Sequence, residues 1–303
     1  MENTNSHQDR IELLKGSTYS DDEYDTYDYD DQSDSDEDEG FEMRSEPEVL
    51  AGTCVSNMVP IIYHNHLLLE EKYRVRPETI IALQNWFKNE YRRIVINWMI
   101  QLHNDLSNSS DSIFLAIAYF DNFLMKKSIQ KEQLHLVAAV CFWLATKVDS
   151  VRTLSFAILN QKSSNIFTKE QFMAMEIEIF ESLDFCLSYP TPKEFLRRYM
   201  KATCASEEVY MFADFILKTS ICEIELATYL PSELAYASFY TSCYALSNDE
   251  IYLNLEKMRL IDISNIKELV SMIKNVIEKP IEKLKAEGSA QTITDRLDLN
   301  RVK

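Results

Sequence analysis

One uninterrupted apolar segment limits the fold of this chain more than any other feature. The sequence LHLVAAVCFWLAT, residues 134–146, contains no charged side chain if its histidine is neutral. A helix that is apolar on every side must be buried on every side. The segment is too short to span a bilayer, which requires about 20 apolar residues. We therefore expect it to form the central helix of a small helical bundle.

The rest of the chain continues this helical pattern. With only 4 Gly and 7 Pro in 303 residues, the sequence offers few tight turns and few β-hairpin signals. Apolar residues spaced by three and four predict further helices on both sides of the segment, and Pro190 and Pro192 interrupt the series. The sequence predicts an all-α protein of two tandem five-helix bundles. We expect the first bundle, with a preceding helix, over 59–189 and the second over 190–285.

The acidity of the chain is concentrated near its N-terminus. Between Ser20 and Glu48, 15 acidic residues accompany one basic residue, Arg44, so this stretch carries −14 of the total net charge of −18 and leaves −4 for the remainder. Such a stretch repels itself and has too little apolar surface to offset the entropy of ordering. We expect a disordered acidic tail over 1–58 and a flexible C-terminal tail over 286–303.

Composition argues against several partners and activities. Phosphate binding requires clustered Lys and Arg, so nucleic acid is not an expected partner. The N-terminus lacks the apolar core of a secretory signal, and no apolar run has the length of a membrane span, so we expect an intracellular protein without a membrane partner. The six scattered cysteines contain no C-x-x-C pair, which predicts reduced thiols and no metal site. Without a phosphate loop or a His-based triad, we expect no catalytic residue and no cofactor.

The stretch YRRIVINWMIQLHNDL, residues 91–106, carries the most specific pattern in the chain. It resembles the opening helix of the cyclin box, and four further family positions recur downstream at matching separations: Asp121, Leu136, Lys147 and Glu176. Together with TYLPS at 228–232, the pattern is most similar to the A/B-type mitotic cyclins. The resemblance implies N- and C-terminal cyclin boxes. It also implies a regulatory subunit, itself no enzyme, that forms a heterodimer with a cyclin-dependent Ser/Thr protein kinase and activates it, at the G2/M stage of the cell cycle.

The resemblance further implies a structural ion pair between Arg92 and Asp121. Both residues stand in predicted apolar helices, where an isolated charge is costly and each therefore needs the other. In the family this pair orients the first two helices of the box.

Two polar residues, Lys147 and Glu176, are the candidate kinase contacts. Taken alone, they predict a plain salt bridge at the rim of a core. The resemblance instead implies that Lys147 donates hydrogen bonds to backbone carbonyls of the kinase and that Glu176 accepts from its backbone N–H groups. Apolar side chains would supply the contact area around them. The matching positions, which by spacing alone are equally typical of core residues, are Val148, Phe180, Phe185 and Leu187.

A second family site, a shallow groove that docks Arg-x-Leu segments of substrates and inhibitors, maps onto the first helix and the apolar segment. Its positions in this chain are Tyr91, Ile94, Val95, Trp98, Gln101 and His135. Three of them depart from the family: Tyr91 replaces Met, His135 replaces Gln, and Gln101 replaces the acidic residue that pairs with the arginine of the peptide. Loss of that carboxylate removes a charge-assisted contact worth roughly 1.5–3 kcal/mol. We expect a groove with altered or reduced selectivity.

Two alternatives stay open beside a mitotic cyclin. One is a transcriptional-type cyclin, and the other is a cyclin-fold scaffold without kinase activation, because a fold does not fix a function. The retention of Lys147 and Glu176 counts against the scaffold. A promoter-binding factor of the same architecture would require a basic face, which the sequence lacks. We expect the protein in the nucleus and cytoplasm, although no clear nuclear import signal is visible.

Overall fold

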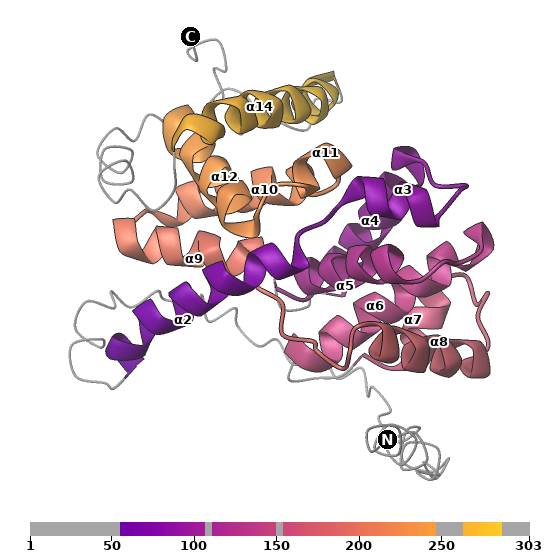
Figure 1. Ribbon diagram of the computed structural model, residues 1–303. Helices are drawn as coiled ribbons and strands as arrows, with labels where there is room; N and C mark the ends of the chain where they lie inside the picture. The colour runs from indigo at the N-terminus through magenta and orange to yellow at the C-terminus, as the bar shows by residue number, and fades with distance from the viewer. Residues whose placement is uncertain (1–54, 107–110, 150–153, 247–262, 287–303) are drawn as a thin grey trace, which may run out of the picture. The chain divides into compact units, whose positions relative to one another are not determined.

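The computed structural model describes residues 55–106, 111–149, 154–246 and 263–286. In these ranges every regular element is a helix, which confirms the predicted all-α class (Figure 1). The expectations of a disordered acidic tail and of a flexible C-terminal tail concern residues that lie almost entirely outside the described ranges.

The first bundle is built around α6, the predicted central helix. All side chains from Leu136 to Thr146 are buried, as an apolar surface on every side requires. Helix α6 packs against its neighbours α4, α5 and α8 (Figure 1). The helices of this bundle are α4 (Asn89–Asp105), α5 (Ser112–Lys126), α6 (Leu134–Asp149), α7 (Phe156–Lys162) and α8 (Lys169–Ser182).

The second bundle has α12 at its centre, in contact with α9, α10 and α14. Its first helix begins at Pro192, where Thr191 accepts a hydrogen bond from the backbone N–H of Glu194 and the Glu194 carboxylate bonds back to the N–H of Thr191. A short helix, α11, follows α10 after a break of three residues. The described helices are α9 (Pro192–Thr203), α10 (Glu207–Ser220), α11 (Ile224–Ala227), α12 (Pro231–Ala245) and α14 (Ile263–Ala286).

Helix α2 (Val55–Glu70) precedes the first bundle in sequence but packs on the second. The buried carboxylate of Glu70 accepts hydrogen bonds from the backbone N–H and the hydroxyl of Ser232, at 2.9 and 2.8 Å, in the first turn of α12. Arg74 donates to the carbonyl of Thr228 at 2.9 Å, just after the 3-10 turn η1 (Glu71–Tyr73). A carboxylate at a helix N-terminus satisfies donors that the helix cannot satisfy itself. These bonds fasten the N-terminal helix to the second bundle.

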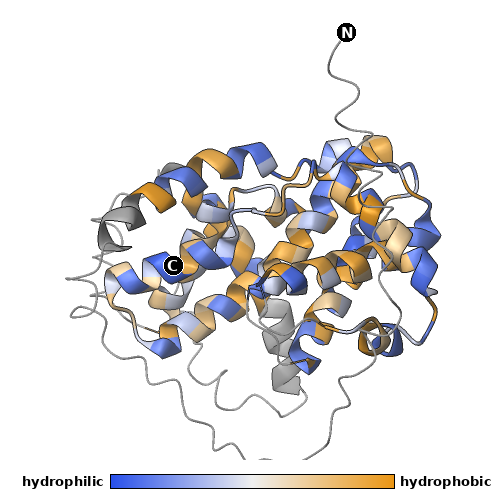
Figure 2. Ribbon diagram, turned by 90° about the horizontal axis from the view of Figure 1, so that it is seen from below, coloured by the Kyte–Doolittle hydropathy of each residue, from blue (hydrophilic) through white to orange (hydrophobic). Residues whose placement is uncertain are grey.

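A buried glutamine, Gln84, lies between α3 (Pro77–Leu83) and α4. The Gln84 amide donates to the carbonyls of Leu124 and Lys127 and accepts from the N–H of Ile129, at 3.1, 2.6 and 3.1 Å. It thereby caps the end of α5 from outside. Figure 2 shows that hydrophobic residues lie mainly on the helix faces turned toward other helices.

Candidate functional site

The predicted kinase-contact pair lies between α6 and α8. The Lys147 ammonium is 2.8 Å from a carboxylate oxygen of Glu176. The two side chains differ in exposure, since that of Lys147 is 32% exposed and that of Glu176 only 10%. An ammonium has three donors and a carboxylate about four acceptor sites, so one contact leaves both groups able to bind a further partner. The pair can therefore present a donor and an acceptor side by side.

Trp143 orients the lysine of this pair. The Lys147 nitrogen lies 3.4 Å from the centroid of the indole ring, within the range of a cation–π interaction. The ring is fixed in turn, because its N–H donates to the carbonyl of Leu154 at 2.7 Å and its edge packs against Phe172. Sequence reasoning missed this contact, since a tryptophan in an uncharged helix is typical of a core residue.

The four predicted apolar neighbours of the pair are not core residues. Val148 is 50% exposed and Phe185 is 46% exposed, whereas Phe180 and Leu187 are half-buried. The rings of Phe180 and Phe185 lie nearly parallel, with centroids 6.3 Å apart. Several large apolar side chains exposed to solvent on one surface are typical of an interaction site.

An unusual turn presents Phe185. Both Asp184 and Phe185 adopt left-handed backbone angles, with φ of 54° and 55°. This conformation is unfavourable for residues other than glycine, and the surrounding structure must hold it. The N–H of Phe185 donates to the carbonyl of Phe180 at 2.9 Å, and the Asp184 carboxylate pairs with Lys126 at 2.8 Å. The Lys126 ammonium also lowers the pKa of Asp184 below its ordinary value.

Two further apolar residues extend this surface and were absent from the sequence prediction. Met173 and Ile177 are exposed on α8, and with Phe180 they follow a spacing of four and three. This spacing places the three side chains on one face of the helix. A neighbouring face, which carries Phe172 and Ile179, is buried. The signal was visible in the sequence as an α8 segment apolar on two faces. We call Val148, Met173, Ile177, Phe180, Phe185 and Leu187, together with Lys147 and Glu176, the α6–α8 surface.

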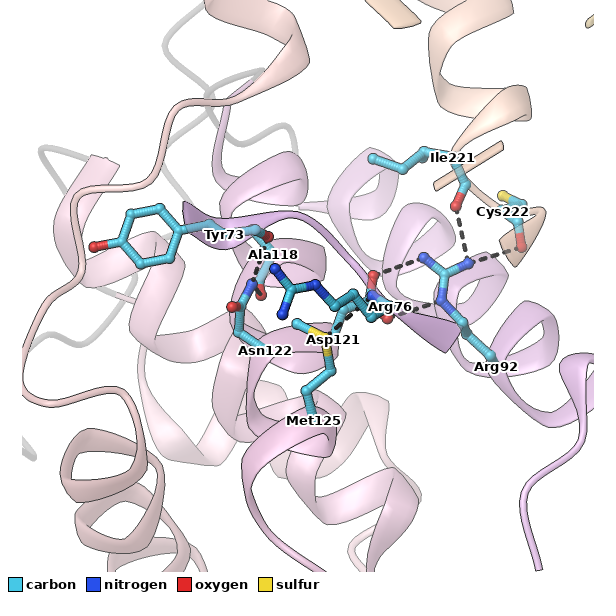
Figure 3. Close-up of polar contacts among 9 residues, drawn as sticks. All are labelled: Tyr73, Arg76, Arg92, Ala118, Asp121, Asn122, Met125, Ile221 and Cys222. Carbon is cyan, nitrogen blue, oxygen red and sulfur yellow. Dashed lines mark hydrogen bonds and ion pairs between the residues drawn. The ribbon is translucent and has the colours of Figure 1, made fainter. Parts of the chain in front are cut away.

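The predicted pair of Arg92 and Asp121 forms a fully buried, two-bonded contact between α4 and α5 (Figure 3). The guanidinium donates to both carboxylate oxygens, at 2.8 and 2.7 Å. It also donates to the carbonyls of Ile221 and Cys222, each at 3.1 Å, immediately after the last turn of α10. A cation is favourable at a helix C-terminus, where carbonyls lack partners. Arg92 therefore joins the two bundles as well as the first two helices, a role that the sequence did not predict.

The positions predicted to form a docking groove lie on one face of α4 and at the start of α6. Ile94 is 63% exposed and Gln101 is also exposed, while Tyr91, Trp98 and His135 are half-buried. The rings of Trp98 and His135 meet edge to face at 4.4 Å. Val95 departs from the expectation, because it is buried in the core and contributes little surface. We call Tyr91, Ile94, Trp98, Gln101 and His135 the α4–α6 patch.

In the described ranges, no three His, Cys, Asp or Glu side chains gather where they could hold a metal ion. In the same ranges, no helix combines the length and the apolarity needed to cross a bilayer.

Comparison with protein families identifies the class of this chain. Residues 61–188 match the model of the cyclin N-terminal domain, and residues 190–292 match that of the cyclin C-terminal domain. Together the two matches cover most of the chain. The chain therefore belongs to the cyclin family, with two cyclin boxes in tandem.

The curated relatives include both B-type and A-type cyclins. Cyclin-B2-1 of Oryza sativa subsp. japonica is 30% identical over 215 residues, which cover 71% of this chain and 51% of the relative. The G2/mitotic-specific cyclin-B2 of Oryzias luzonensis is 27% identical over 73% of this chain and 57% of its own length. The chain thus spans about half the length of the curated relatives it matches.

Among solved structures, a viral cyclin from herpesvirus saimiri has a similar fold. The TM-score is 0.62, with 19% sequence identity over 73% of this chain and 96% of the viral protein. At this identity the likeness concerns the fold alone.

Proposed function

We propose that this chain is the regulatory subunit of a cyclin-dependent Ser/Thr protein kinase and that it has no catalytic activity of its own. The α6–α8 surface carries the proposal. It combines an open Lys147–Glu176 pair with a rim of exposed apolar side chains, the composition of a specific protein interface. Membership of the cyclin family and the B-type relatives support it.

The two halves of the pair have distinct roles in this proposal. Lys147 donates to backbone carbonyls of the kinase, and Glu176 accepts from its backbone N–H groups. When Glu176 turns part of its hydrogen-bonding capacity to the kinase, the Lys147 charge still lies on the Trp143 ring. The apolar residues of the α6–α8 surface supply contact area. The polar pair fixes how the two surfaces are aligned.

Activation then follows from differential affinity. A protein kinase is active only when the glutamate of its regulatory helix pairs with the catalytic lysine. A surface that fits only this inward arrangement shifts the kinase population toward it. A shift from mostly inactive to mostly active requires about 5 kcal/mol of differential affinity. Rigid elements are suited to this task, and Phe185 is presented by a turn held through Asp184 and Phe180.

The stage of action proposed is G2/M, and the location is the nucleus and cytoplasm. The names of the relatives, which include a G2/mitotic-specific cyclin-B2, support this stage for the chain. A transcriptional-type cyclin and a cyclin-fold scaffold are the alternatives. The α4–α6 patch is proposed as a secondary site that docks peptide segments of substrates or inhibitors, because Ile94 and Trp98 offer apolar surface outside the α6–α8 surface.

A binding and activity assay tests the kinase proposal. The full chain is used to retain cyclin-dependent kinases of the same organism, and the retained kinase is assayed on a histone peptide. The Lys147→Ala/Glu176→Ala variant should lose at least about 30-fold in affinity, as truncation of buried interface charges does.

The matched control is Lys162→Ala/Asp105→Ala, which removes an ion pair of the same length, 2.8 Å, from an exposed site on another part of the first box. This variant should retain and activate the kinase like the unaltered chain. A well-folded unaltered chain that retains no kinase would favour the scaffold instead.

A further inference from the structure

A lysine lies against the tyrosine at one end of the α4–α6 patch. The Lys131 ammonium is 4.1 Å from the centroid of the Tyr91 ring and donates a hydrogen bond to its hydroxyl at 3.0 Å. Lys131 belongs to the 3-10 turn η2 (Lys131–Gln133), which leads directly into α6. Its charge is thus held beside the patch by an aromatic ring and is not free to sample the rotamers of a surface lysine.

This charge differs from those of three other lysines of the first box. Lys126, Lys127 and Lys162 each lie within 3.1 Å of a carboxylate, on Asp184, Glu178 and Asp105 respectively. Lys131 makes no ion pair with any residue in the described ranges, and its neighbour in contact is a phenol. An ammonium that uses one of its three donors can still donate to a carboxylate, and here it would break no existing ion pair.

The surroundings of Tyr91 are basic on balance. Its hydrogen bond to Lys131 and the charge of Lys131 lower the pKa of Tyr91, Lys88 acts in the same direction, and Glu90 opposes them. Arg93, on the same helix, is already paired with Glu223 at 3.6 Å. Two cations and one anion therefore act on this end of the patch.

The other end of the patch is neutral. Gln101 is exposed and carries an amide, which offers no charge to an arginine or a lysine of a bound segment. His135 contributes no charge either, because burial lowers its pKa and keeps the imidazole neutral near pH 7. Its Nε2 is buried without a hydrogen-bond partner between the rings of Trp98 and Phe167. The patch thus offers apolar surface, one fixed cation and no contacting carboxylate.

We propose that the α4–α6 patch binds an extended segment of a partner protein in which acidic residues, not basic ones, flank a bulky apolar side chain. The inference rests on the proposed docking function of the patch and specifies its ligand class. The apolar side chain packs on Ile94 and Trp98, and an aspartate or glutamate of the segment pairs with Lys131. Because the Tyr91 ring already orders Lys131, the pair loses less side-chain entropy than an ordinary surface salt bridge.

Matched peptides test the proposal on the full chain. Three labelled peptides share an Ala-Leu-Phe-Ala core and carry Asp, Asn or Arg on both flanks. At about 150 mM salt the Debye length is about 8 Å, so contact pairs persist while charges farther from the bound peptide are screened. The expected order of affinity is Asp, then Asn, then Arg, with about 2- to 5-fold between successive peptides, the range of an exposed charge contact.

Charge reversal isolates the local contact, because the field of the rest of the chain is the same in every variant. Lys131→Glu should reverse the order of the Asp and Arg peptides, and Gln101→Glu should raise the affinity for the Arg peptide. The control Lys201→Glu, which makes the same charge change on α9 of the second box, should leave the order as it is.

Three outcomes overturn the proposal: tighter binding of the Arg peptide by the unaltered chain, an unchanged order in Lys131→Glu, or no binding of any peptide. Kinase retention by the unaltered chain is measured in parallel. If the chain retains a kinase but the peptides do not bind in the expected order, the proposed ligand class is wrong and the proposed regulatory function is still supported. If the peptides bind in the expected order but no kinase is retained, the ligand class is supported and the proposed regulatory function is wrong.

Discussion

Two ion pairs of the first box, similar in chemistry, are built for opposite purposes. Arg92 and Asp121 are fully buried, and the guanidinium donates to the carboxylate on one side and to two carbonyls on the other. Lys147 and Glu176 share a single contact, and the lysine remains about one-third exposed. A buried pair whose bonding capacity is filled can only hold structure, whereas a half-open pair can bind something else. Burial and bonding capacity, more than residue type, separate the structural pair from the proposed binding pair.

The largest expected effect comes from breaking the closed pair. Arg92→Met leaves the Asp121 carboxylate buried without a cation, and removing one partner of such a pair costs about 3–5 kcal/mol. Denaturant unfolding should show a loss of this size. The double variant Arg92→Met/Asp121→Leu removes both charges and should recover a large part of it.

The recovery should be incomplete, because the carbonyls of Ile221 and Cys222 still lose their donor. A single variant that unfolds within about 1 kcal/mol of the unaltered chain would contradict the structural role assigned to the pair.

A buried histidine without an ion-pair partner sharpens the comparison through pH. His103 is only 5% exposed, and its Nδ1 lies 3.5 Å from the hydroxyl of Ser112, which is a long hydrogen-bond distance. Burial lowers its pKa from 6.5 to about 4, with Lys218 and Lys193 acting in the same direction and Asp214 and Asp149 against it. The imidazole is therefore neutral in the folded protein near pH 7.

The sign of the pH dependence follows from this lowered pKa. Below about pH 6.5 the unfolded chain binds a proton that the folded chain resists until about pH 4, so the free energy of unfolding falls as the pH falls through this window. At 1.36 kcal/mol per pKa unit, the loss amounts to about 3 kcal/mol. A His103→Gln variant should lose less stability between pH 6.5 and 4. Parallel curves for the two proteins would show that His103 does not titrate in this way.

The fold was predictable because its determinants are local, whereas several site contacts depend on tertiary structure. The apolar segment ending before Lys147 identified the central helix, and the resemblance to the cyclin box pointed to Arg92, Asp121 and Glu176. The carbonyl partners of Arg92, by contrast, lie more than a hundred residues away, after α10. No spacing rule reveals such a contact.

Two further details of the site could not be predicted from the sequence, for reasons other than distance along the chain. Trp143 in an apolar helix is indistinguishable from a core residue until the lysine above its ring is placed. The left-handed turn at Asp184 and Phe185 has no glycine to announce it, because the fold and not the local sequence imposes it. The roles of the α6–α8 surface and of the α4–α6 patch in binding stay predictions.

The smallest expected effect on stability comes from the open pair, and it completes the comparison. Lys147→Met removes a cation–π contact and an ion pair whose lysine is about one-third exposed, each worth about 1 kcal/mol or less. The free energy of unfolding should fall by about 1 kcal/mol, well below the loss in Arg92→Met, while kinase retention falls sharply. Lys162→Met, which removes an exposed pair, should change neither quantity measurably. If Lys147→Met instead destabilises the chain as much as Arg92→Met, the pair is structural, and a loss of kinase binding in that variant would no longer indicate direct contact.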